Sequence, residues 1–186
     1  MKFCSACGAP VTLTIPEGDH LPRYVCTACK TVHYENPRII TGCVPEWQGK
    51  ILLCKRAIEP RRGYWTVPAG FMENGEAVQD GAAREAMEEA LARVEIGSLL
   101  SIVNVIRAHQ VHITFRAHLL DGEFGVGPES LETKLCDASE IPWDDIAFLS
   151  AEFALRRYLE DRQAGLQRAH FRDIDWRDGN LVLTDR

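Results

Sequence analysis

The segment from Gly70 to Ala90, GFMENGEAVQDGAAREAMEEA, places three glutamates close together on what reads as one helix. Glu85, Glu88 and Glu89 fall within five positions, and at about 100° per residue their side chains point to one side of the helix. Like charges three and four residues apart repel, so a cation among the carboxylates would relieve the pattern. The alternative is that they are solvated surface glutamates, the usual reading of an isolated Glu-x-x-Glu-Glu.

Four cysteines near the N-terminus form two Cys-x-x-Cys pairs, Cys4 with Cys7 and Cys26 with Cys29, with eighteen residues between the pairs. This spacing predicts a structural zinc site, because each short turn supplies two of the four thiolates that tetrahedral Zn²⁺ prefers. With sulfur in all four positions no site is left for water, so the metal is expected to fold the segment and not to catalyse. Disulfides are the alternative, and a reducing compartment disfavours them.

A formal net charge of −6 argues against a general binder of phosphate backbones, while 46% apolar residues is an ordinary globular share. The segment before Pro37 has no basic stripe, since Lys2, Arg23 and Lys30 are balanced by three acidic residues. No apolar run reaches membrane-spanning length, and the early cysteine pair leaves no room for a leader peptide. We expect a cytoplasmic protein without a membrane partner and with no nucleic acid partner; a homodimer stays open.

Apolar patterning after Pro37 predicts an α/β (α+β) domain in which helices cover a β-sheet. Strands are predicted from RIITGCVPEW and ILLCKR, which read as a hairpin, and from YWTV, LLSIVNVIR and VHITFRAHLL. The predicted domains are residues 1–36, residues 37–162 and a C-terminal tail, residues 163–186, in which the pattern defines no element.

Two helices are predicted, the first from Glu76 or Ala77 to at least Leu91 and the second from Ala147 to Asp161. In the first helix the apolar positions roughly opposite the glutamates are expected to pack on the sheet: Ala83, Met87, Ala90 and Leu91.

The residues around the glutamates follow a long pattern: Gly70, five residues, Glu76, seven residues, then REAMEE. The pattern resembles the signature of the Nudix hydrolases. This resemblance implies a Nudix-type α/β/α sandwich with a mixed sheet, in which a loop–helix–loop holds divalent metals against a diphosphate joined to a nucleoside. One position departs from the family pattern, because Leu91 stands where a glycine usually ends the helix.

By position, the resemblance implies that Glu85, Glu88 and Glu89 bind Mg²⁺ (or Mn²⁺), with the carbonyl of Gly70 as an additional ligand. Mg²⁺ prefers octahedral oxygen coordination and keeps several waters, one of which can become the nucleophile. The resemblance also implies an ion pair between Arg84 and Glu76 that fixes the helix to the loop before it.

The general base is implied to be a helix glutamate or a glutamate on a later loop. The later segment PESLE offers Glu129 and Glu132, of which Glu132 is preferred.

Substrate contacts are expected from an aromatic side chain against the base and from an arginine on the phosphates. The aromatic candidates are Trp65 and Phe71, with Tyr64, Phe115 and Phe148 also considered, and the arginines are Arg116 and Arg107. Each aromatic residue has a place in the core as its alternative.

The resemblance continues through FCSACG, VCTAC, HYENPR, LLCKR, GYWTVPAGFME, GPESLE and IPWDDIAF. Together these look like the Nudix branch that carries an N-terminal zinc ribbon and includes plant FAD pyrophosphatases. The SQPWPFP segment of NADH pyrophosphatases is absent, as is the proline that ADP-ribose hydrolases often show after the motif.

The implied activity is metal-dependent hydrolysis of the diphosphate in a nucleoside diphosphate derivative: FAD, ADP-ribose or an NADH-like dinucleotide. A non-catalytic nucleotide sensor would be expected to lose a metal glutamate, and an RNA cap-processing enzyme would be favoured by a basic groove. Both stay open as alternatives.

Overall fold

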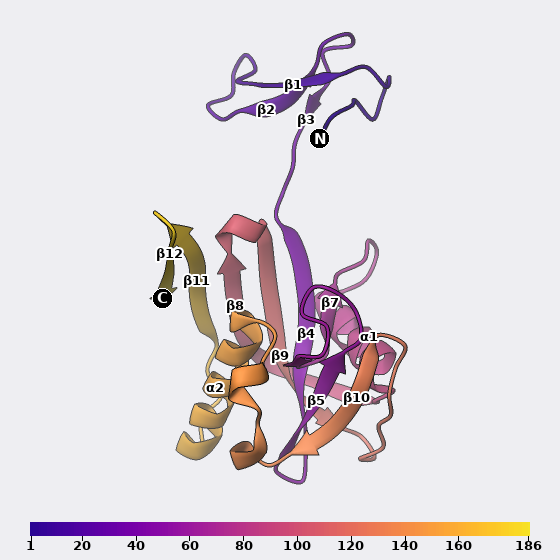
Figure 1. Cartoon of the computed structure of the whole chain (residues 1–186), viewed down its shortest axis with the longest axis vertical. Helices are drawn as coiled ribbons and strands as arrows, with labels where there is room; N and C mark the ends of the chain where they lie inside the picture. The colour runs from indigo at the N-terminus through magenta and orange to yellow at the C-terminus, as the bar shows by residue number, and fades with distance from the viewer. The chain divides into compact units, whose positions relative to one another are not determined.

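The computed structural model describes residues 1–186, which divide into two compact units, Met1–Pro37 and Arg38–Arg186. The first unit is a three-stranded antiparallel sheet in the order β1-β2-β3 (Figure 1). Its strands are β1 (Val11–Thr14), β2 (Arg23–Cys26) and β3 (Val32–His33).

The four predicted zinc ligands meet in this first unit. The Sγ atoms of Cys4, Cys7, Cys26 and Cys29 all lie within 4.8 Å of one another, and three of the pairs are 3.5 to 3.7 Å apart. Thiolates bonded to zinc at about 2.3 Å form a tetrahedron with edges of about 3.8 Å. The cysteine cluster therefore has the size of a zinc ribbon site.

The second unit holds one mixed nine-stranded sheet in the order β10-β5-β4-β9-β8-β11-β12, with β6 paired to β5 and β7 to β4. Pairs β4–β9 and β8–β11 are parallel and the others are antiparallel. The elements are β4 (Arg38–Trp47), β5 (Lys50–Arg56), β6 (Trp65–Thr66), β7 (Ala69–Phe71), α1 (Val78–Ala90), β8 (Val94–Val105), η1 (Ile106–Ala108), β9 (Gln110–Leu119), β10 (Ser130–Cys136), η2 (Ala138–Glu140), η3 (Trp143–Asp145), α2 (Leu149–Ala164), β11 (His170–Arg177) and β12 (Asn180–Asp185).

Adjacent residues of β4 pack on opposite faces of the sheet. Cys43 lies in a cluster with Ala82 and Ala86 of α1, whereas Val44 lies in a cluster with Ala154 and Leu155 of α2. Because side chains alternate along a strand, β4 is buried on both faces. The second unit is thus a helix–sheet–helix sandwich (Figure 1), which confirms the predicted fold class.

The first helix ends where the family pattern would place a glycine. Helix α1 runs from Val78 to Ala90, and Leu91 adopts a left-handed conformation with φ of 49°. Its backbone N–H bonds to the carbonyl oxygen of Met87 at 2.9 Å, which satisfies one of the last carbonyls of the helix. Leu91 therefore ends the helix despite its side chain.

The predicted apolar face of α1 is partly wrong: Ala90 is buried and Ala83 half-buried, but Met87 and Leu91 are exposed. The helix buries the small residues Ala82, Ala86 and Ala90, whereas Met87 and Leu91 are 40% and 52% exposed. Small side chains let the helix approach the sheet closely, so size decides which face is covered here and hydrophobicity does not. Glu85 and Glu89 are accordingly buried, while Glu88 is exposed.

Residues 163–186 were predicted to be a C-terminal tail, but in the structure they belong to the second unit. Strand β11 extends the sheet in parallel to β8, and β12 pairs with β11. Ile174 of β11 is 1% exposed and packs with Val103 and Phe153. The second helix, α2, also ends three residues later than predicted, at Ala164 instead of Asp161.

Neither α1 nor α2 has the length and apolar character that a membrane-spanning helix needs.

Replacing Leu91 with glycine should raise the free energy of unfolding by about 1 kcal/mol. A left-handed conformation is less favourable by about 1–2 kcal/mol for a residue with a Cβ, and the freedom of glycine in the unfolded chain offsets part of this. The melting temperature should rise by about 2–4 °C in scanning calorimetry. Gln79→Gly, at an exposed position inside the same helix, is the matched control and should lower the melting temperature. A fall for both variants would contradict the assignment.

Candidate active site

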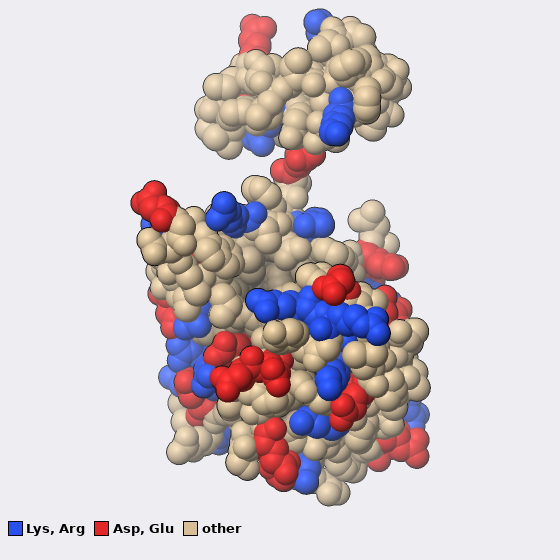
Figure 2. Space-filling model, viewed as in Figure 1, with Lys and Arg blue, Asp and Glu red and all other residues tan.

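The second unit contains a cleft of about 790 Å³, a volume typical of small-molecule sites. Its walls come from β4, β7, α1, β9, the segment after β5 and the start of α2. The charged residues that line it are Arg56, Glu59, Glu73, Arg84, Glu85, Glu88, Glu89 and Glu129. Lys and Arg side chains also form a band across the middle of this unit in Figure 2, so positive charge is concentrated locally although the chain is acidic.

Arg84 connects α1 to the loop that precedes it. Its Nε and Nη2 atoms donate to the two carboxylate oxygens of Glu76 at 3.0 and 2.9 Å. Nη1 donates to Glu85 at 2.6 Å and to Glu88 at 3.0 Å, and Nη2 also donates to the carbonyl oxygen of Phe71 at 3.1 Å. One guanidinium therefore fixes the loop and orients two of the three helix carboxylates.

Glu76 is a charged partner for Arg84 and not an acid–base group. Hydrogen bonds from Arg84 and from the backbone N–H of Glu73 lower the pKa of Glu76 to about 2. The ion pair in turn raises the pKa of Arg84 above its ordinary value. Both groups are consequently charged at neutral pH, as a permanent structural contact requires.

Glu85 and Glu89 are buried, with exposed fractions of 7% and 6%. Burial raises the pKa of Glu89 to about 8, with repulsion from Glu85 as the next cause, and burial also raises the pKa of Glu85. The only hydrogen bond to the Glu89 carboxylate comes from the backbone N–H of Ala69, at 3.3 Å. Two buried carboxylates that repel each other beside a cleft form an environment that a bound cation stabilises.

Gly70 lies directly against Glu85. A Cβ atom at position 70 would overlap the carboxylate of Glu85, so glycine is needed here for close approach. The carbonyl of Gly70 and the carboxylates of Glu85, Glu88 and Glu89 are all oxygen donors of the kind that Mg²⁺ binds. The residues present therefore fit a divalent cation of this class.

The structure places Glu129 at the cleft and Glu132 away from it. Glu129 lines the cleft close enough to raise the pKa of both Glu85 and Glu89 by repulsion. Glu132, the preferred general base, lies on β10 and pairs with Lys55 at 3.6 Å. Pairing of β10 with β5 sets Glu132 opposite Lys55, whereas Glu129 lies in the loop before the strand.

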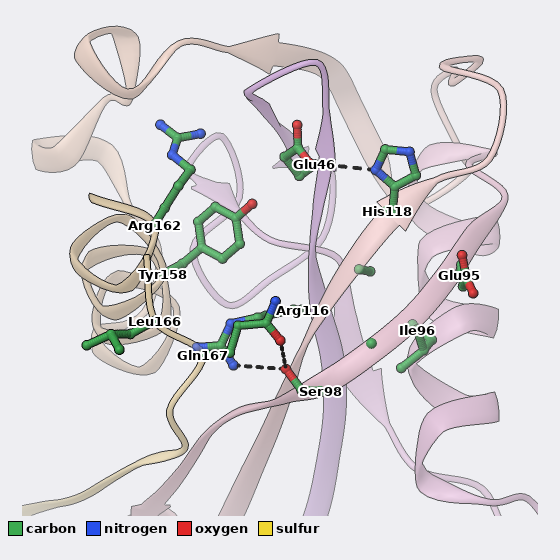
Figure 3. A pocket seen from close by; sticks show the side chains of 12 residues that line it. Glu46, Glu95, Ile96, Ser98, Arg116, His118, Tyr158, Arg162, Leu166 and Gln167 are labelled. Atoms are coloured by element: carbon green, nitrogen blue, oxygen red, sulfur yellow. Dashed lines mark hydrogen bonds and ion pairs between the residues drawn. The ribbon is translucent and has the colours of Figure 1, made fainter. Parts of the chain in front are cut away.

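Arg116, predicted as a phosphate clamp, does not line the cleft. It pairs with the buried Asp161 and donates to the carbonyl oxygens of Leu99 and Arg168 at 2.8 and 2.9 Å. Figure 3 shows it beside Ser98 in a separate cavity of about 310 Å³. Its hydrogen bonds are used inside the protein, so it anchors α2 and the segment after it to the sheet.

Most of the proposed aromatic contacts are structural. Trp65 is 6% exposed in the core beneath α2, and Phe115 is 6% exposed in the cluster under α1. Tyr64 does not line the cleft, where Phe71 and Phe148 do. The sequence could not separate these cases, because an aromatic residue in a strand is compatible with either face. Arg107, in η1, also lies outside the cleft lining.

Arg56 is a cleft residue that the sequence analysis missed. Its guanidinium carbon lies 5.0 Å from the ring centre of Phe148, and its charge lowers the pKa of Glu89 against the larger effect of burial. Its Nε donates to the carbonyl oxygen of Pro60 at 2.9 Å, which fixes the loop after β5. The segment LLCKR contained this residue, but its role depends on the helix that brings Phe148 beside it.

A family model described as Nudix N-terminal, for the zinc ribbon, matches residues 2–35, and the NUDIX domain model matches residues 36–161. The second match covers more than half of the sequence. The chain belongs to the Nudix hydrolase family, and a zinc-ribbon module precedes its catalytic domain.

Three relatives illustrate the range of similarity. A NUDIX hydrolase structure from Nitrosomonas europaea is 56% identical, with a TM-score of 0.88, and the match covers 92% of this chain and 97% of that one. An ADP-ribose pyrophosphatase of Methanocaldococcus jannaschii is 31% identical over 59% of this chain and 67% of its own. The NAD-capped RNA hydrolase NudC of Stutzerimonas stutzeri is 28% identical over 85% of this chain, which spans 54% of that relative.

Replacing Gly70 with alanine should reduce kcat for diphosphate hydrolysis by about 10- to 100-fold while the fold persists. The added methyl group must displace the Glu85 carboxylate, and misplacement of a catalytic group by about 1 Å can have an effect of this size. Gly97→Ala is the matched control, because the nearest atom to its added Cβ would be the carbonyl oxygen of Arg116, at 3.3 Å. Steady-state rates and thermal melts check both variants, and equal activity in the two would contradict the assignment.

Proposed function

We propose that this chain hydrolyses the diphosphate linkage of an ADP derivative, with a divalent cation held by Glu85, Glu88, Glu89 and the carbonyl of Gly70. The observation that carries the proposal is the pair of buried, mutually repelling carboxylates beside a cleft that can admit a ligand. A non-catalytic sensor is disfavoured because all three helix glutamates are present.

Bound Mg²⁺ would supply a water of lowered pKa and would offset negative charge on the phosphates. The residues of the chain perform the remaining tasks. Arg84 orients Glu85 and Glu88, Arg56 is placed to bind a phosphate oxygen, and Glu129 is the loop carboxylate available to accept a proton. We assign Glu129 this role instead of Glu132 on the basis of its position in the cleft.

ADP-ribose is the first substrate to test, and FAD and NADH share its ADP half. Two relatives are named for ADP-containing substrates, one as an ADP-ribose pyrophosphatase and one as an NAD-capped RNA hydrolase. The resemblance to the FAD pyrophosphatase branch keeps FAD as a candidate. The net charge of −6 disfavours a long RNA body, although the band of basic side chains in Figure 2 makes a capped oligonucleotide a useful comparison.

We further propose that Cys4, Cys7, Cys26 and Cys29 bind one structural Zn²⁺. Sulfur in all four positions excludes an open coordination site. The cytoplasm, where thiols stay reduced, is the location that suits such a site. A homodimer stays a prediction.

Wild-type protein with Mg²⁺ or Mn²⁺ should release AMP from ADP-ribose, and Glu89→Gln should lower kcat by about 10²-fold or more. Glutamine keeps the size of the side chain but removes an anionic ligand and its effect on the developing charge. Mass spectrometry of products from ADP-ribose, FAD, NADH and an NAD-capped oligonucleotide checks both points. Glu132→Gln is the matched control and should retain wild-type rates. Absence of turnover of all four substrates, or full activity of Glu89→Gln, would refute the proposal.

Natively purified protein should contain one zinc per chain, and Cys4→Ser should lose it. Apparent binding energies of such sites are about 10 kcal/mol or more at neutral pH, so the metal should survive dialysis against a weak chelator. Elemental analysis provides the measurement. Cys136→Ser, which alters a buried cysteine of the second unit, should keep its zinc. Wild-type protein without zinc would show that the cysteines serve another purpose.

A further inference from the structure

The cleft contains a second group of polar side chains that the proposed chemistry does not use. Gln110 and His112 of β9 and Ser150 of α2 all line it. Oγ of Ser150 lies 2.9 Å from Nδ1 of His112, and Nε2 of His112 lies 3.1 Å from Oε1 of Gln110. Ser150 is 5% exposed, so this chain of hydrogen bonds starts in the interior and ends at Gln110.

The direction of these two hydrogen bonds follows from the protons that Ser150, His112 and Gln110 carry. Burial lowers the pKa of His112 to about 4, so the ring is neutral near pH 7 and has one N–H group. Oε1 of Gln110 can only accept, which places that proton on Nε2 and leaves Nδ1 to accept the hydroxyl proton of Ser150. The reverse direction would leave the Ser150 proton without an acceptor, because His112 is the only hydrogen-bond partner of its side chain.

This direction determines what Gln110 can offer a ligand. Its Oε1 accepts from His112 and keeps a second lone pair, while its NH₂ group has no acceptor within the protein. The amide cannot flip, because its NH₂ group would then face the N–H of His112. Gln110 therefore presents a donor and an acceptor in a fixed order to the cleft.

We propose that Gln110 reads the adenine edge of the substrate, with its NH₂ group donating to a ring nitrogen and its Oε1 accepting from the exocyclic amine. This inference rests on the proposed function, which supplies an ADP derivative. Glutamine pairs with adenine in this two-bond arrangement at N6 and N7. Guanine has an acceptor where adenine has the amine, so it would place O6 against Oε1.

The same part of the molecule suits a planar base. Phe71 and Phe148 line the cleft that contains Gln110, and Ile40, which is opposite His112 in the sheet, adds aliphatic surface. Apolar side chains favour any base through stacking and burial, but they do not distinguish adenine from guanine. In this cleft the distinction rests on the order of donor and acceptor that His112 and Ser150 hold at Gln110.

A chemical double-mutant cycle tests the contact. Rates are measured for wild-type protein and Gln110→Leu with ADP-ribose and with its 1-deaza and 7-deaza adenine analogues, in which C–H replaces one ring nitrogen. In wild-type protein, the analogue that lacks the ring nitrogen contacted by Gln110 should lower kcat/KM by about 10-fold, mainly through KM, as loss of one hydrogen bond predicts. Gln110→Leu removes both contacts and should lower kcat/KM for ADP-ribose by about 10- to 100-fold. In Gln110→Leu that analogue should cause no further loss. Losses that multiply for both analogues would overturn the proposal.

The role of Ser150 and His112 in orienting Gln110 is tested by comparing the rates for ADP-ribose and GDP-ribose. Ser150→Ala should reduce the preference for ADP-ribose over GDP-ribose by about 3- to 10-fold, because His112 can then present its proton on either nitrogen and Gln110 can flip. Thermal melts establish that the variant folds. Gln167→Leu changes a glutamine of the separate cavity and should keep wild-type selectivity. Unchanged selectivity in folded Ser150→Ala, or in Gln110→Leu, would refute the orienting role.

The outcome also separates this inference from the proposed function. If wild-type protein turns over ADP-ribose but the cycle shows no coupling, the assignment of Gln110 is wrong and the activity stands. If no substrate is hydrolysed, calorimetric binding of ADP and of 1-deaza- and 7-deaza-ADP to wild-type protein and Gln110→Leu gives the same cycle without catalysis. Equal affinities in that cycle would overturn the proposal.

Discussion

The guanidinium of Arg84 is the contact on which the arrangement of the cleft depends. It joins Glu76 in the loop, the carbonyl of Phe71 in β7, and Glu85 and Glu88 on the helix. A flexible ammonium could not make these contacts together, because they use the fixed fork of a guanidinium. Arg84 thereby holds Glu85 and Glu88 in position before a cation binds. Repulsion among the helix carboxylates lowers the stability of the metal-free protein.

The stability of the first unit is limited by a different feature: the unit has no apolar core. Cys4 and Cys26 are its only buried residues, and large apolar side chains such as Phe3, Leu13 and Tyr34 are exposed. A segment this short buries too little surface to offset the entropy of folding without a crosslink or a metal. Two of the four predicted zinc ligands, Cys4 and Cys26, are therefore the only interior of the unit.

Features encoded by short-range spacing could be predicted from the sequence. The cysteine pairs, the helix glutamates and the two-sided burial of the sheet follow from patterns of three to seven residues, because local geometry places such residues together whatever the remainder does. The end of α1 at Leu91 is the exception. Leucine itself gave no signal for a left-handed residue, and only the family pattern, which has glycine there, marked the position at which the structure has φ of 49°.

The sequence by itself determined the family, the metal-ligand set to be tested and the class of fold. Only the tertiary structure decided which candidate residues reach the cleft. Glu129 replaced Glu132, and Arg116 became an anchor for Asp161, because strand register and helix packing set these positions across long separations in the chain. The role proposed for Gln110 could not have been derived from the sequence, since it depends on a helix that brings Ser150 to His112.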